Sequence, residues 1–85
     1  MPRREKPKPS VSVCLSISSQ IGATVRKRRE ALGMSQEQLA EKSGISKNYA
    51  GNIERGEYDA TIGTLSCVAR SLGCRVADLL DEANV

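Results

Sequence analysis

Apolar residues from position 19 onward recur at the three- and four-residue spacing of α-helices. The first such stretch carries Ile21, Val25 and Leu32, and Gly33 follows it as a stop signal. We therefore predict a helix over Ser19–Leu32. Four shorter helices are expected after it, over residues 36–43, 47–55, 62–72 and 76–82.

Residues that cap helices stand where these helices should begin. Ser18 or Ser19 is available to the first helix, and Ser35 precedes the second with Gln38 placed to complete a capping box. Thr61 is suited to cap the helix at 62–72. Arg75 offers no acceptor to the last helix, which should therefore be poorly initiated. Five helices with short links predict a compact all-α domain over residues 19–85.

Residues 11–18 follow a different pattern, in which apolar residues at 11, 13, 15 and 17 alternate with serine or cysteine. This two-residue period is typical of a strand. Three structures fit it: an extended lead-in to the domain, a strand paired with a second subunit, and an early start to the first helix. Residues 1–10 hold three prolines and four basic groups. We assign residues 1–18 to a disordered basic N-terminal arm and an extended segment.

The segment from Gln36 to Arg55 has the layout of a helix-turn-helix. Gly44 stands at the turn, where a positive φ is expected. Ser46 follows as the N-cap of the second helix, and Ala40 is small where the two helices pass closest. The apolar residues that the two helices share with a core are Leu39, Ile45 and Ile53.

The net charge of +3 is unevenly distributed. Residues 1–29 contain eight basic groups and one acidic group, and the remaining residues contain five basic and nine acidic groups. A basic end on a near-neutral body suits a polyanionic partner. The two tyrosines are the only aromatic residues, so the core must be aliphatic.

The chain has no histidine, and its three cysteines lack CxxC spacing. Four-ligand zinc patterns and histidine-based catalysis are therefore excluded, and we expect no metal, no cofactor and no enzymatic activity. We expect Cys67 to be partly exposed and Cys74 to be buried, both as inert thiols in a reducing cytoplasm. The longest apolar stretches are too short for a membrane span or a signal peptide.

Several motifs together resemble one known family. They are Ile21 through Arg29 ahead of LGMSQEQLA, then KSGIS, NIERGE, TLSCVARSLG and VADLL, over about residues 20–82. This order and spacing are similar to the helix-turn-helix domain of phage lambda Cro and repressor proteins, the Xre family. The resemblance implies a sequence-specific transcriptional regulator that binds double-stranded DNA as a homodimer on a palindromic operator. The helix at about 47–55 would enter the major groove.

The resemblance also assigns roles to residues. Gln36 would donate to a phosphate and brace the recognition helix. Ser46, Lys47 and Asn48 would begin that helix, and Asn52 would lie one turn further along the same face. Asparagine suits adenine N6 and N7, whereas lysine suits guanine or a phosphate. The backbone phosphates would be held by Lys47 and Arg55.

Similar domains pair an arginine of the first helix with the glutamate of the IERG segment. By motif position these residues are Arg29 and Glu54, and we expect a partly buried ion pair that orients the recognition helix. Tyr49 is expected to pack rather than to bind phosphate.

Three features depart from the family pattern. Ala50 is smaller than the usual core residue and Gly51 weakens the helix, so the recognition helix should be marginal. Glu57 and Asp59 would repel phosphates, so the loop that carries them should not contact DNA.

We expect the homodimer to form through the last two helices, with the 11–17 strand as a further contact. The apolar residues expected at this surface are Val76, Leu79, Leu80 and Val85. The alternative function is a protein-interaction or antitoxin-type module, in which the basic arm and residues 11–17 fold onto a protein partner.

Overall fold

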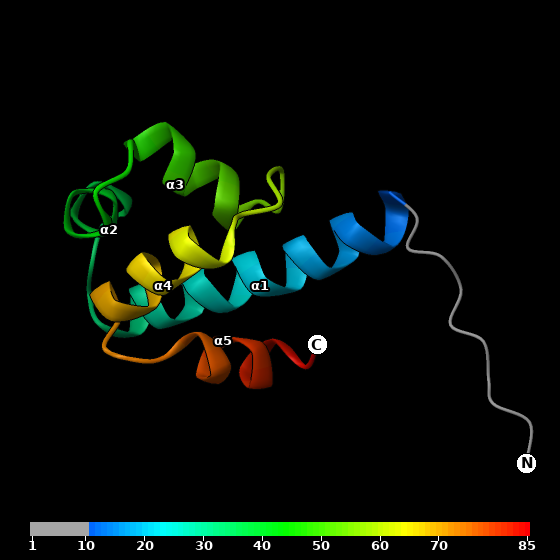
Figure 1. Ribbon diagram of the computed structural model, residues 1–85. Helices are drawn as coiled ribbons and strands as arrows, with labels where there is room; N and C mark the ends of the chain where they lie inside the picture. Colours follow the sequence, from blue (N-terminus) through cyan, green and yellow to red (C-terminus); the bar gives the residue numbers. More distant parts are fainter. Residues whose placement is uncertain (1–10) are drawn as a thin grey trace, which may run out of the picture.

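The computed structural model describes the backbone of residues 11–85 and the side chains from residue 17 onward. Within these residues the chain forms five α-helices and no strand (Figure 1). They are α1 (Val11–Ala31), α2 (Gln36–Ser43), α3 (Lys47–Glu54), α4 (Ile62–Ser71) and α5 (Val76–Ala83). The predicted all-α class is confirmed, and the last four helices begin where the sequence pattern predicts. In the described range no helix is both long and apolar enough to cross a membrane.

Three of the four later helices, α2, α3 and α4, begin with the predicted caps. The Ser35 hydroxyl accepts from the backbone of Gln38, whose side chain accepts in return from the Ser35 backbone at 2.8 Å, so the capping box is complete. The hydroxyl of Thr61 accepts in the same way at the start of α4. At α5 the Arg75 side chain makes no cap bond, but Asp78 accepts from the Arg75 backbone at 2.9 Å. A carboxylate in the first turn therefore supplies the initiation that Arg75 lacks.

The core is aliphatic and lies where α1, α2, α4 and α5 meet. It is formed by Val25, Leu39, Val68, Ala69, Leu72 and Leu79. Figure 1 shows α2 and α3 on one side of α1 and α5 on the other. Ser43 and Ser71 share a hydrogen bond of 2.9 Å that links α2 to α4 beside this core. Two helices therefore hold the helix-turn-helix: α3 packs on α1, and α2 packs on α4.

The extended segment expected over residues 11–18 is wrong, because α1 already begins at Val11. Its first turns extend beyond the other helices (Figure 1). A lone strand would leave its backbone N–H and C=O groups without partners, whereas a helix satisfies them within itself. The 11–17 strand is thereby removed as a subunit contact, and Ser18 and Ser19 lie inside α1 rather than at its start. The basic arm expected over residues 1–10 lies outside the described residues.

The crossing of α1 and α3 depends on two glycines. A Cβ added to Gly22 would overlap the carbonyl oxygen of Ile53 and lie 2.7 Å from that of Glu54. Gly56 follows α3 and has a φ of +74°. A Cβ added to it would lie 2.6 Å from the Cα of Ser19. The backbones of α1 and α3 are therefore in direct contact, which only glycine at these positions permits.

The two described cysteines differ in environment. Cys67 is exposed, as predicted. Cys74 was expected to be buried but is only half-buried, because it lies in the link before α5 and packs against the core from one side. Burial raises the pKa of the Cys74 thiol above its usual value, although the nearby Arg28 charge opposes this shift.

We expect iodoacetamide to alkylate Cys67 faster than Cys74 in the folded protein at neutral pH. The thiolate is the reactive form, and Cys74 is both less accessible and harder to deprotonate. Timed labelling followed by peptide mass spectrometry measures both rates in one sample. Equal rates in the native protein would contradict the environments described, and equal rates in denaturant serve as the control.

Candidate nucleic-acid interface

The turn between α2 and α3 presents one face of α3 to solvent. Gly44 adopts the left-handed conformation, at φ 72° and ψ 28°, and its N–H returns to carbonyl groups of α2. The Ser46 hydroxyl then accepts from the Tyr49 backbone at 3.0 Å and starts α3. Lys47 and Asn48 are exposed in the first turn, and the half-buried Asn52 lies one turn further along. The turn at Gly44 and the cap at Ser46 therefore orient α3 so that its polar face is exposed.

Two shallow hollows lie along this face. The first hollow is lined by Ser46, Asn48, Tyr49, Asn52 and Tyr58. The second hollow is lined by Gln36, Lys47, Asn48, Gly51 and Arg55. Asn48 lines both, so the two hollows adjoin at this residue. All six residues predicted to bind DNA line this double hollow, although they come from α2, α3 and the residues that flank α3.

Two tyrosines that line the first hollow contact each other, and the sequence did not indicate this contact. The rings of Tyr49 and Tyr58 meet edge to face, at 90° and 5.5 Å between centroids. Tyr49 is half-buried, in agreement with the packing expected for it, and Tyr58 remains 54% exposed. No local pattern in the sequence indicates this contact, because Tyr58 belongs to the irregular loop after α3.

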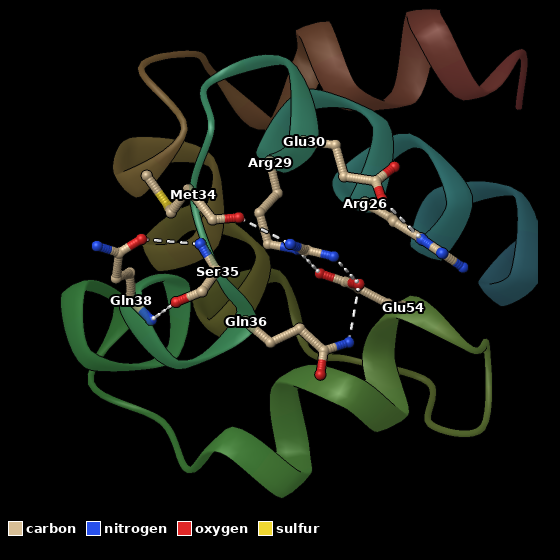
Figure 2. Close-up of polar contacts among 8 residues, drawn as sticks. All are labelled: Arg26, Arg29, Glu30, Met34, Ser35, Gln36, Gln38 and Glu54. Atoms are coloured by element: carbon tan, nitrogen blue, oxygen red, sulfur yellow. Dashed lines mark hydrogen bonds and ion pairs between the residues drawn. The ribbon is translucent and has the colours of Figure 1, made fainter.

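An ion pair fixes α3 against α1, as predicted (Figure 2). The guanidinium of Arg29 donates to both carboxylate oxygens of Glu54, at 2.6 Å and 3.1 Å, and to the carbonyl oxygen of Met34 at 2.7 Å. The Glu54 side chain is 2% exposed and that of Arg29 11%. The hydrogen bond to Glu54 raises the pKa of Arg29, so this guanidinium stays charged across the accessible pH range.

Gln36 joins this network and thereby has a defined orientation. Its Nε2 donates to Glu54 Oε1 at 3.1 Å (Figure 2). A carboxylate only accepts, so the amide nitrogen must face Glu54 and the oxygen must face away. The side chain therefore braces α3 as expected. One amide hydrogen is engaged inside the protein and one remains for a further acceptor.

Arg55 is engaged with its neighbours rather than extended into solvent. Its Nε donates to Glu57 Oε1 at 2.9 Å, and its NH2 group donates to Asn52 Oδ1. The Arg55 and Glu57 side chains are both about half exposed, so this pair contributes little to stability. The sequence indicated only repulsion of phosphates by Glu57, whereas in the structure Glu57 and Asn52 hold Arg55 between them.

The charge on this face is carried mainly by two cations. Lys47 stands at the N-terminus of α3, where the helix dipole adds positive potential, and Arg55 stands at its C-terminus. Glu57 and Asp59 lie on the loop that follows. The face therefore has a cation at each end of α3, of which Arg55 is paired with Glu57, and amide groups between them. This arrangement suits an anionic ligand.

Comparison with known proteins identifies relatives over most of the chain. The helix-turn-helix family model matches residues 25–79. The control protein C.SmaI of Serratia marcescens is 38% identical over 73 residues, 85% of this chain and 87% of the relative. The immunity repressor protein of Bacillus phage phi105 is 36% identical over 62 residues, 73% of this chain but only 43% of the repressor.

Solved structures show the same arrangement of helices. The clp gene regulator ClgR from C. glutamicum superposes with a TM-score of 0.77 at 32% identity, over 91% of this chain and 92% of that one. The restriction-modification controller protein C.AhdI from Aeromonas hydrophila gives 0.71 at 32% identity, over 73% and 94%. Sequence and structure therefore agree that this chain belongs to the Xre-type helix-turn-helix family of DNA-binding transcriptional regulators, which are not enzymes.

Proposed function

We propose that this protein is a sequence-specific transcriptional regulator that binds a palindromic DNA operator as a homodimer, with α3 in the major groove. The observation that carries this proposal is the double hollow along α3. It gathers amides and cations from α2 and from residues 47–55 on one face. The names of the relatives, a control protein and an immunity repressor, agree with a regulatory role.

The residues of the double hollow divide into two roles in this proposal. Asn48 and Asn52 are the candidates for base contacts, because amide groups can match the donor and acceptor pattern of the major groove. Lys47, Arg55 and the free amide hydrogen of Gln36 would bind phosphates and fix the register. Ser46 would present the N-terminus of α3 to the duplex.

We propose dimerisation because one short helix makes few base contacts, and two half-sites multiply its specificity. The proposed surface on α4 and α5 is smaller than the sequence suggested. Leu79 is fully buried in the core of its own subunit, so it is not available to a partner. Val85 and Ile62 remain exposed at 50% and 68%. Sedimentation equilibrium of the wild type and of Val85→Glu tests this surface, and an unchanged dimer in the variant would exclude Val85 from it.

Selection of bound sequences from a random duplex pool at physiological salt tests the proposed function. We expect enrichment of a palindrome whose half-sites lie about one helical turn apart. A folded protein that enriches no sequence would overturn the proposal, and would favour the alternative of a protein-interaction module.

Two substitutions separate the proposed roles. Asn48→Ala should weaken binding by about 1–3 kcal/mol for the selected operator and relax its preference at one base pair. Lys47→Ala should weaken binding to all sequences alike and reduce the magnitude of the salt slope by about 1. Fluorescence anisotropy over a salt series measures both quantities. A Lys47→Ala protein with an unchanged slope would remove Lys47 from the phosphate contacts.

A further inference from the structure

The orientation of the Asn52 amide is set by Arg55. The NH2 group of Arg55 donates to Asn52 Oδ1. A guanidinium has no acceptor, so the Asn52 atom that faces it must be the carbonyl oxygen. The amide is planar, and its amino group therefore points along the other branch, away from Arg55.

Asn52 and Arg55 are neighbours on the polar face of α3, but they line different hollows. Asn52 lines the first hollow, together with Tyr49 and Tyr58, whereas Arg55 lines the second. Arg55 is itself held from its far side by Glu57, through a hydrogen bond of 2.9 Å. The two hydrogen bonds, from Arg55 to Glu57 and from Arg55 to Asn52, thus hold the Asn52 oxygen on the Arg55 side and leave its amino group free.

This orientation changes which base Asn52 can read. Bidentate recognition of adenine requires the amide to accept from N6 and to donate to N7. Arg55 occupies one of the two acceptor positions of the Asn52 oxygen, and its positive charge opposes the approach of an N6 amino group. Asn52 therefore presents its own amino group, a donor. The amino group of Asn52 carries two donor hydrogens. Such donors match the guanine edge, where O6 and N7 are both acceptors.

We propose that Arg55 is a positioning residue that makes Asn52 a donor, so that the base read by Asn52 is guanine rather than the adenine that an isolated asparagine favours. This inference rests on the proposed DNA-binding function and adds the specificity of one position to it. Glu57 supports it by holding Arg55 in place.

The test uses the full chain and the operator obtained by selection. The position read by Asn52 is the one at which Asn52→Ala loses its base preference. We expect the wild type to bind guanine there about tenfold more tightly than adenine, the size of one good base contact. Arg55→Met should abolish or reverse that ratio, because the freed Asn52 amide can then turn toward adenine. In the Asn52→Ala background Arg55→Met should leave the ratio unchanged.

Two controls isolate the positioning role. Arg26→Met removes an equal charge from an exposed pair on α1, whose side chains are 63% and 57% exposed, and should not alter the ratio. A role for Arg55 in phosphate binding alone would lower affinity for both operators equally and keep the ratio, which would overturn the inference. Preference of the wild type for adenine at this position would overturn it too. Failure of the folded wild type to enrich any sequence would instead refute the proposed function itself.

Discussion

Arg29→Ala is expected to destabilise the protein by about 3–5 kcal/mol, the range found when one partner of a buried ion pair is removed. The variant leaves the Glu54 carboxylate, which is 2% exposed, with Gln36 as its remaining side-chain partner. A domain of this size has only a few kcal/mol of total stability, so the variant should be largely unfolded at 37 °C. Urea denaturation followed by circular dichroism measures the loss.

A double-mutant cycle measures the interaction free energy between Arg29 and Glu54 apart from the effect of each single substitution. Glu54→Ala combined with Arg29→Ala should be more stable than Arg29→Ala alone, because no buried charge is then left unpaired. Arg28→Met is the matched control: it breaks a bond of similar length, 2.6 Å to Glu82, but both side chains are about one-third exposed. Solvent screens that pair, and its loss should have a far smaller effect. Zero coupling between Arg29 and Glu54 would refute the role assigned to them.

Gly22→Ala should destabilise the fold even though alanine is the better helix former. The added methyl group would overlap the carbonyl oxygen of Ile53 and approach that of Glu54. Backbone atoms cannot rotate away as a side chain can, so α3 must move off α1. We expect a loss at the upper end of the roughly 1–3 kcal/mol that overpacking costs, despite the gain of about 1 kcal/mol in helix propensity.

Gly63→Ala is the control for this prediction, because a Cβ there meets only Thr61 Oγ1, at 3.8 Å. It should stabilise α4 by about 0.5 kcal/mol. Displacement of α3 in Gly22→Ala should also weaken binding to a selected operator, even under conditions where the variant is folded. A Gly22→Ala protein as stable as the wild type would show that α1 and α3 do not cross as closely as described.

The helix-turn-helix was predictable because its signals are local. Ser35, Gly44 and Ser46 act on backbone groups within a few residues of themselves, so their identity was sufficient to place α2, the turn and α3. The start of α1 was not predictable in this way. An alternating pattern over eight residues is typical of a strand, but a strand forms only where a partner strand satisfies its backbone groups.

The polar residues of the double hollow were also predictable as a set, since helical spacing and the family resemblance place them on one face. The orientations of their side-chain amides were not predicted. Gln36 turns its nitrogen inward because the buried Glu54 needs a donor, and Asn52 turns its oxygen toward Arg55 because a guanidinium can only donate. Leu79 was assigned to a subunit contact, but it is fully buried in the core between the helices.

The sequence alone therefore determined the five helices of the described chain except for the start of α1, the helix-turn-helix and the residues that face outward from it. These follow from backbone chemistry over short distances and from periodicity. Tertiary structure decided the close crossing at Gly22, the burial of Leu79 and the direction of the Gln36 amide. These depend on contacts between residues up to several tens of positions apart, and no local pattern specifies them.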